Sequence, residues 1–156
     1  MVAKIELDEL DRRILNVLQA DASVTNADLA AAVHASPPTC LRRVKRLTDA
    51  GVIEKQVAIV APDKVGQGLT AIVEITLDNQ AVERQAEFEQ LVLGERAVLQ
   101  CYRVSPGPDF VLLLQVADMP AYNALVHRLF AAQANVRNVK TFFSIQRSKF
   151  ETRIDV

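Results

Sequence analysis

The segment from Ser36 to Leu47 constrains the fold more than any other part of this 156-residue chain. Ser36 is a favourable N-cap, because its hydroxyl can accept from the free amides of a first helical turn, and the two prolines after it stand where a helix needs no amide. Leu41, Val44 and Leu47 recur at helical spacing and predict a buried stripe. The remaining positions are rich in cations: Arg42, Arg43, Lys45 and Arg46. The segment therefore predicts a capped helix with one apolar stripe and a basic remainder.

Two shorter patterns before this segment predict two more helices. The first helix has one apolar face and an acidic first turn, which favours the helix dipole; its apolar residues are Leu7, Leu10, Ile14 and Leu18. Leu29, Ala30 and Val33 mark the second helix, and His34 lies in the turn that leads to Ser36. Gly51 stands where a glycine commonly ends a helix. Two helices joined by a tight turn, the second of them basic, are typical of a helix-turn-helix.

The basic helix supplies the candidate DNA contacts. Residues early in such a helix usually meet base edges, and arginine can donate two hydrogen bonds to guanine. For any single cation, contact with phosphate alone or with solvent alone remains an alternative. Thr25 and Asn26 begin the second helix, where they either bind phosphate or simply cap the helix. The candidate set is Thr25, Asn26, Ser36, Pro38, Thr39, Arg42, Arg43, Lys45 and Arg46.

The overall charge does not by itself indicate a nucleic-acid partner. The formal net charge is −1, but the cations are concentrated in one segment, and a local patch decides contact where the average does not. The two cysteines are far apart and form no metal-ligand pattern. No signal peptide and no apolar run long enough to span a bilayer is present, so we expect a cytoplasmic protein that uses no membrane. Binding of DNA by the basic helix would make it nucleoid-associated.

The hydrophobic period changes after Gly51. Val52-Ile53 and Val57–Val60 predict short strands, and a stretch from Pro62 to Gly68 contains the turn residues of a linker. We therefore expect a helix-turn-helix domain over residues 1–54, a strand-containing linker over 55–68 and a second domain over 69–156.

The second domain alternates strands and helices in the order βαββαβ, which is the ferredoxin-like arrangement. The helix over 81–93 is expected to bury Val82, Ala86 and Val92, and Asp118 is expected to cap the second helix. The predicted elements are a strand over 69–77, a helix over 81–93, strands over 98–104 and 110–116, a helix over 119–130 and a strand over 139–147.

One face of this predicted sheet lacks a cover. The run Phe110–Leu114 is apolar at every position, and Phe142 and Phe143 point to opposite faces. Two helices cover only one face of a four-stranded sheet. We therefore expect the chain to associate with a second copy of itself, because apolar patches of that size are uncommon on monomers.

The whole layout resembles the Lrp/AsnC (feast/famine) transcription regulators. The resemblance rests on Leu10–Leu15, on Ser36–Leu47 with the Asp49–Ile53 exit, and on the two segments Val104–Phe110 and Ala117–Tyr122. It implies an α+β fold, with an N-terminal winged-type helix-turn-helix domain and a C-terminal ferredoxin-like domain that senses an effector and dimerises. The resemblance further implies that the protein binds duplex DNA and forms a dimer through the sheet faces. Dimers in this family often assemble into octamers.

In this family, effector amino acids bind between dimers, near the turn that joins the second and third strands. Here that turn contains Gly107 flanked by two prolines, which remove amides that a ligand would use. Backbone amides of the turn suit a ligand carboxylate, and an aspartate suits an α-ammonium group. The resemblance implies the effector set Ser105, Gly107, Asp109, Val139 and Thr141. Val139 replaces a hydroxyl of some relatives, so we expect an apolar effector such as leucine or methionine.

Two other functions compete with a sequence-specific regulator. A nucleoid-organising protein of low specificity would use the same DNA-facing residues. Some similar proteins decarboxylate a tetrapyrrole, and His127, Arg103 and Tyr102 are conceivable players, but they form no cluster at catalytic spacing. No glycine-rich phosphate loop, nucleophile triad or zinc spacing is present. We therefore expect no catalytic residue, no metal and no cofactor.

Overall fold

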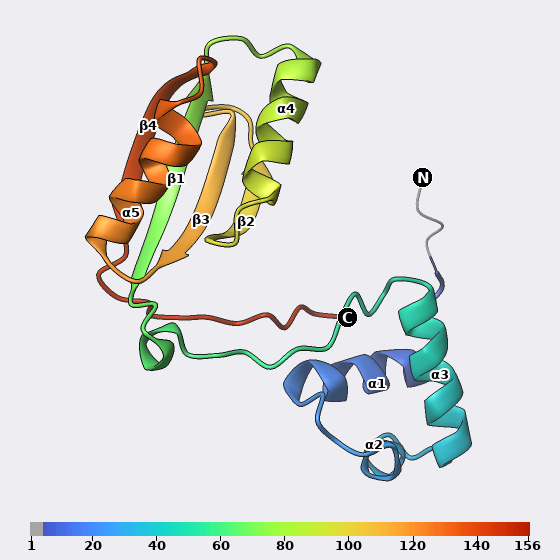
Figure 1. Cartoon of the computed structure of the whole chain (residues 1–156). Helices are drawn as coiled ribbons and strands as arrows, with labels where there is room; N and C mark the ends of the chain where they lie inside the picture. The colour runs from blue at the N-terminus through green and yellow to red at the C-terminus, as the bar shows by residue number, and fades with distance from the viewer. Residues whose placement is uncertain (1–4) are drawn as a thin grey trace. The chain divides into compact units, whose positions relative to one another are not determined.

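The computed structural model describes residues 5–156 and shows an α+β chain with two compact units (Figure 1). One unit, which we call the head, combines the residues up to Ile59 with Lys149–Val156. The other unit, the sheet unit, is Val60–Ser148. Each unit has its own hydrophobic core. None of the helices within residues 5–156 has the length and apolarity that crossing a bilayer requires.

The head contains the three expected helices, α1 (Glu9–Ala20), α2 (Asn26–Ala32) and α3 (Pro37–Asp49). Asp8, Thr25 and Ser36 cap them, each side chain accepting from the amide three residues later. The turn before α3 places His34 at φ 55°, and Gly51 adopts φ 71° just past the end of α3, which is where a glycine relieves the steric cost of the left-handed region.

The buried stripe of α3 differs from the prediction at one position. Cys40 and Leu47 are fully buried, whereas Leu41 is 63% exposed. Cys40, Val44 and Leu47 have the i, i+4, i+7 spacing of a single helical face, and the small thiol is accommodated between the helices. Leu41 lies about 100° around the helix axis from Cys40 and so points away from the core.

The predicted strands at Val52-Ile53 and Val57–Val60 are absent from the described chain, which has no regular structure between Lys55 and Ala61. A strand needs a neighbour for its backbone amides and carbonyls, and none pairs with this segment here. Val52 and Ile53 instead pack against the head core.

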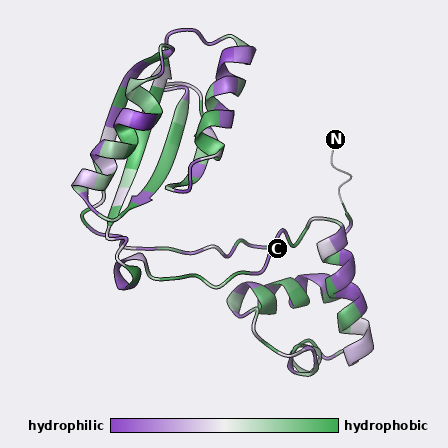
Figure 2. Ribbon diagram, in the orientation of Figure 1, coloured by the Kyte–Doolittle hydropathy of each residue, from purple (hydrophilic) through white to green (hydrophobic). Residues whose placement is uncertain are grey.

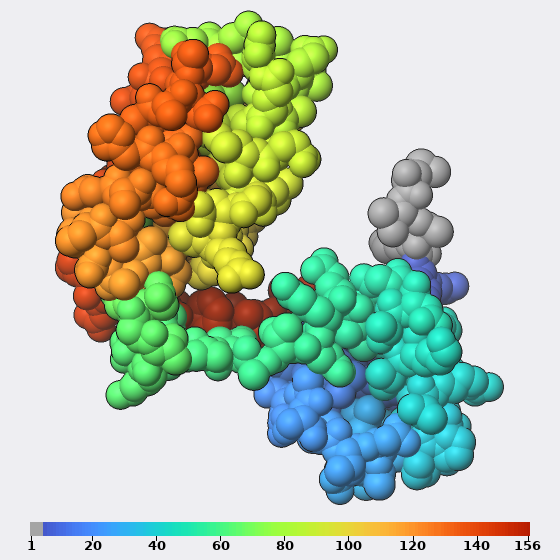
Figure 3. Space-filling model, in the orientation of Figure 1, coloured from blue at the N-terminus to red at the C-terminus, as the bar shows by residue number. Residues whose placement is uncertain are grey.

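The sheet unit is an antiparallel sheet in the order β2-β3-β1-β4, the ferredoxin-like arrangement. Both long helices lie on one face of the sheet (Figure 1), and the space-filling view shows them side by side, α4 in yellow-green and α5 in orange (Figure 3). The elements are η1 (Pro62–Val65), β1 (Leu69–Leu77), α4 (Val82–Leu93), β2 (Val98–Arg103), β3 (Phe110–Val116), α5 (Met119–Val126), η2 (His127–Ala131) and β4 (Val136–Phe143).

The core of this unit lies between the sheet and the helices. Alternate residues of β1 and β3 are buried there, and both strands are hydrophobic over most of their length (Figure 2). The helix α4 contributes Phe88 and Val92, while Val82 is 70% exposed, so the expected inward role of Val82 and Ala86 was wrong. The reason is that α4 packs on the sheet through its C-terminal half.

The last strand is shifted relative to the prediction, starting at Val136 and ending at Phe143 rather than spanning 139–147. Its pairing with β1 ends where β1 begins: Phe143 lies opposite Ala71, and the amide of Ser144 donates to Thr70 O at 3.0 Å. Beyond Ser144 no neighbour remains to continue the ladder within the described residues.

The outer face of the sheet is partly apolar, as predicted. Ile72 pairs with Phe142, and these side chains are 40% and 45% exposed. Phe143 points to the other face, where its ring packs edge-on against Tyr122 at 4.8 Å between centroids. The expected opposite orientation of the two phenylalanines is confirmed.

The C-terminal segment packs with the head rather than with the sheet unit, to which the sequence assigned it. The side-chain amide of Gln19 is hydrogen-bonded to the backbone of Ile154, and Val156 contacts the head core. Residues 149–156 therefore follow the sheet unit in sequence but pack with the head.

Candidate functional site

The helix α3 presents one continuous exposed arc. Its exposed residues recur at i, i+1, i+4, i+5 and i+8 spacing, as one side of a helix does. The arc comprises Pro37, Pro38, Leu41, Arg42, Lys45, Thr48 and Asp49. Of the predicted DNA contacts, Pro38, Arg42 and Lys45 lie on this arc, and Ser36 is exposed just before it.

The other two arginines of α3 face α1 and form ion pairs there. Arg43 contacts Asp8 at 2.6 Å and Asp11 at 3.3 Å, and Arg46 also contacts Asp11. The Asp11 side chain is fully buried, so its charge is balanced by two guanidinium groups rather than by water. Arg43 and Arg46 therefore hold α3 against α1 in addition to any role toward DNA.

The ion pairs of Asp8 and Asp11 with these arginines were not predicted from the sequence. The acidic first turn had been attributed to the helix dipole alone, yet Asp8 and Asp11 form a capping box in which each side chain accepts from the other's amide. The hydrogen bond from the Asp11 amide, together with the Arg43 guanidinium, holds the pKa of Asp8 below its ordinary value of 3.8. The capping-box spacing was the signal in the sequence that could have identified this pair.

Lys45 and Arg42, the two cations of the exposed arc, form none of the ion pairs that join Arg43 and Arg46 to α1 in the described chain. Lys45 pairs with Asp49 at 2.8 Å on the surface, and this carboxylate raises the pKa of the lysine. Arg42 has no ion-pair partner in the part of the chain that the structure describes, and it lines a hollow of about 380 Å³ with Arg43 and Arg46. Arg42 is thus the arginine of α3 that is most available to an anionic partner.

The remaining DNA candidates already have partners inside the head. The Thr25 hydroxyl caps α2 and donates to Asp28 at 2.6 Å, and the Asn26 amide donates to the carbonyl of Pro37 at 2.8 Å. The Ser36 hydroxyl donates to Thr39 at 2.8 Å. These contacts fix the turn between α2 and α3 and set the orientation of the arc.

The effector candidates do not form one pocket within a single chain. Ser105 and Gly107 are exposed in the loop between β2 and β3, and Gly107 has φ 120°. Val139 and Thr141 lie on β4, at the opposite edge of the sheet from β2. The Thr141 hydroxyl faces the helix layer and is hydrogen-bonded to the Tyr122 hydroxyl at 2.5 Å.

Asp109 has a structural contact of its own. It is buried, its carboxylate Oδ2 accepts from the amide of Leu77 at 2.7 Å, and its own amide donates to Ile75 O at 2.8 Å. These two bonds attach the loop between β2 and β3 to the end of β1. One carboxylate oxygen is therefore already used by the fold.

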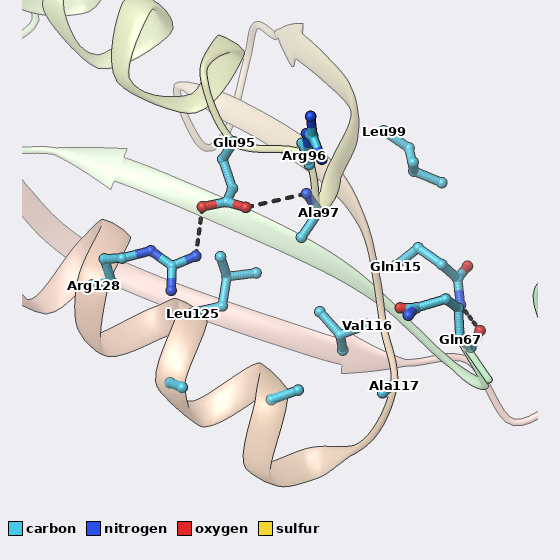
Figure 4. A pocket seen from close by; sticks show the side chains of 12 residues that line it. Gln67, Glu95, Arg96, Ala97, Leu99, Gln115, Val116, Ala117, Leu125 and Arg128 are labelled. Atoms are coloured by element: carbon cyan, nitrogen blue, oxygen red, sulfur yellow. Dashed lines mark hydrogen bonds and ion pairs between the residues drawn. The ribbon is translucent and has the colours of Figure 1, made fainter. Parts of the chain in front are cut away.

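A pocket of about 610 Å³ lies between α5 and the segment that leads into β2 (Figure 4). Its floor includes Val116 and Leu125, and none of the five effector candidates lines it. Most of its polar groups bind each other: Glu95 contacts Arg128 at 2.5 Å, which lowers the pKa of that carboxyl group. The pocket therefore offers few free polar groups to orient a small molecule.

Two family models match the chain. Residues 7–54 match one described as winged helix-turn-helix DNA-binding, and residues 70–154 match one described as the Lrp/AsnC ligand binding domain. Among curated proteins, an uncharacterized HTH-type transcriptional regulator of Haemophilus influenzae is 41% identical over 148 residues, which cover 95% of this chain and 88% of that protein.

Solved structures give the same result over nearly the whole length. An AsnC family transcriptional regulator from Agrobacterium tumefaciens superposes with a TM-score of 0.89 at 34% identity, covering 95% of this chain and 96% of that one. A transcriptional regulator from Neisseria meningitidis, solved as an L-Met complex, also has a TM-score of 0.89, at 30% identity and 96% coverage of both chains.

Proposed function

This chain belongs to the Lrp/AsnC family of DNA-binding transcription regulators, and we propose that it binds specific duplex sites through α3 under the control of a small apolar amino acid. The family carries an effector-binding domain, and the named relatives are regulators rather than enzymes. We further propose that it acts in the cytoplasm, at the nucleoid.

The observation that carries the DNA-binding proposal is the exposed arc of α3. It places Arg42 and Lys45 on the surface, at the outer side of a helix whose inner side is the head core. A helix of this kind fits the major groove, where cations contact phosphates and base edges. Ser36, Pro38 and Thr39 precede the cations and would lie near the bases, and Thr25 and Asn26 near the backbone. Arg43 and Arg46 would reach DNA only from the side of the arc.

The proposal is tested by selecting duplexes from a random library with the full-length protein. We expect one enriched motif, pseudo-palindromic if the protein binds as a dimer, with an affinity at least about a thousandfold above that for random DNA. Equal affinity for all duplexes would instead favour the alternative, a nucleoid-organising protein of low specificity. Arg42→Ala should weaken binding, whereas Arg84→Ala, an exposed arginine of α4, is the matched control.

For the effector we propose the loop between β2 and β3 together with β4, the latter from a neighbouring copy. The exposed backbone around Ser105 and Gly107 would hold the carboxylate, and Asp109 Oδ1 the ammonium group, since Oδ2 is engaged by Leu77. Val139 and Thr141 would then border the ligand at the edge of β4, although Val139 packs against the core and the Thr141 hydroxyl is bonded to Tyr122 in the single chain. The N. meningitidis regulator binds L-methionine, which supports leucine or methionine as the first ligands to test.

Calorimetry of the full-length protein against the twenty amino acids tests this part. Heat and a thermal shift for leucine or methionine, reduced by Asp109→Asn, would support the loop site, because this change removes the charge that would hold the ammonium group and keeps an oxygen for the Leu77 amide. If Arg96→Ala reduced this heat and thermal shift instead, the effector would bind in the pocket beside α5, which Arg96 lines. No heat and no thermal shift for any amino acid would exclude the sensing role.

We propose that dimers form through the outer face of the sheet and that dimers assemble into octamers. Ile72 and Phe142 lie opposite each other on β1 and β4, and both are exposed on that face. Ile72→Glu with Phe142→Glu should give monomers by analytical ultracentrifugation, and Leu93→Glu, on the exposed side of α4, should not. A double variant that keeps the wild-type mass would place the interface elsewhere.

A further inference from the structure

Leu41 is a large apolar residue in the middle of the exposed arc of α3. It is 63% exposed and makes no part of the head core. One exposed leucine is ordinary on a protein surface. This one is distinguished by its neighbours: Pro37 and Pro38 lie one turn before it, Lys45 lies one turn after it and Arg42 adjoins it.

The charge around Leu41 restricts what covers it. Arg42 and Lys45 lie on the same exposed arc, and Arg42 has no ion-pair partner among residues 5–156. A surface with cations at its margin and an apolar centre is complementary to a polyanion that carries apolar groups. Duplex DNA has this composition, with phosphates at the rim of the major groove and base edges at its floor.

The major groove offers a leucine side chain only one favourable contact. Adenine, guanine and cytosine present hydrogen-bonding atoms, whereas thymine also presents its C5-methyl group. Leucine can neither donate nor accept a hydrogen bond, so against any other base it would desolvate polar atoms without replacing their partners. Contact with a thymine methyl group buries apolar surface on both sides.

We propose that Leu41 determines specificity by packing against the C5-methyl group of a thymine in each half-site. This inference rests on the proposed DNA-binding function and adds one base preference to it. The residues of the arc then have different roles. Leu41 recognises a methyl group, and Arg42 and Lys45 contact phosphates or guanine beside it. Leu41→Ala should keep the head folded, because the side chain supports no other residue of the core.

The experiment uses the motif selected with the wild-type protein. Each thymine in it is replaced in turn by deoxyuridine, which removes only the methyl group and leaves every hydrogen bond intact. At one thymine per half-site, we expect the affinity of the wild-type protein to fall about fourfold, the factor that corresponds to burial of one methyl group. Leu41→Ala should bind the unmodified site more weakly and should lose its response to that deoxyuridine.

The outcomes separate this inference from the proposed function. If no motif is selected at all, both the proposed function and the role of Leu41 that rests on it are refuted. If a motif exists but no deoxyuridine weakens binding, or if Leu41→Ala responds like the wild type, the role of Leu41 is refuted while the regulator remains. Leu93→Ala removes an equally exposed leucine from α4 and should respond like the wild type.

The Leu41 side chain could instead be buried against a second copy of the chain. In that case Leu41→Ala would change the sedimentation of the free protein and leave the thymine response unchanged, and the inference would be overturned. An unchanged mass together with a lost thymine response would support it.

Discussion

Gln19 and Ile154 are hydrogen-bonded in both directions, although they lie 135 residues apart in sequence. The Gln19 side-chain amide donates to Ile154 O at 3.0 Å, and the Ile154 amide donates to Gln19 Oε1 at 2.9 Å. A side-chain amide thus pairs with the C-terminal backbone as a neighbouring strand would. Beside it, the Arg153 guanidinium donates to Asn16 at 3.3 Å.

Gln19→Ala should release the C-terminal segment from α1. Two partly exposed hydrogen bonds are lost, and we expect the free energy of unfolding of the head to fall by about 1 kcal/mol. The amide of Ile154 should exchange with solvent faster in the full-length protein, measured by hydrogen exchange. Gln90→Ala, an exposed glutamine of α4, is the control. Unchanged exchange at Ile154 would show that the pairing does not hold the segment.

Asp11→Ala should destabilise the head strongly. The change leaves Arg46 without its carboxylate partner and Arg43 with Asp8 alone, and it removes half of the capping box, so the loss should clearly exceed that of an exposed ion pair. Urea unfolding of the full-length protein measures the loss. Asp49→Ala breaks the exposed pair with Lys45, and its effect on the free energy of unfolding should be much smaller. Equal losses of stability in the two variants would show that the buried position of Asp11 does not make its ion pairs more important than the exposed pair.

The stability of the head should decrease in acid through Asp8. Because the pKa of Asp8 is lowered in the folded state, chiefly by the Asp11 amide and then by Arg43, the unfolded chain binds its proton first as the pH falls. The contribution is complete above pH 3.8 and is lost as the pH drops through the lowered pKa. Asp8→Asn keeps an N-cap but cannot titrate, so its melting temperature should vary less than that of the wild type as the pH falls from 4 to 2. If the melting temperatures of the wild type and Asp8→Asn fell by the same amount over this pH range, Asp8 would not be the group that loses stability in acid.

Arg42 and Arg43 should differ in what their loss affects. Arg42→Ala should leave the melting temperature unchanged and flatten the log–log dependence of DNA affinity on salt by about one unit, the effect of one phosphate contact. Arg43→Ala should first lower the melting temperature, because Asp8 and Asp11 lose a partner. Matching effects of the two variants on the melting temperature would refute the distinction.

The elements of the fold were predictable wherever local rules decide the structure. Ser36 caps α3 and Asp118 caps α5 as expected, and Gly51 ends α3 with a positive φ. The strands β1 and β3 form over 69–77 and 110–116, as their hydrophobic runs predicted. Caps, turns and strand alternation depend on residues a few positions apart, so a sequence displays them directly.

The parts that the sequence did not reveal depend on distant contacts. Choosing Leu41 instead of Cys40 for the buried stripe was an error of one position, which only the packing of α3 against its neighbours decides. The ion pairs of Arg43 and Arg46 join residues more than thirty positions apart. The strands expected after Gly51 had the right composition, but a strand forms only where a partner strand is present.

The C-terminal segment changes the topological relationship of the two units. Since residues up to Ile59 and residues 149–156 build the head together, the sheet unit is an insertion within the head rather than a successor to it. A fragment that stops at Ile59 lacks the strand-like pairing at Gln19. A single proteolytic cut near Lys55 would divide the head into two pieces that stay together, because Ile154 remains hydrogen-bonded to α1. The sheet unit would remain covalently attached to the smaller of these pieces, residues 149–156.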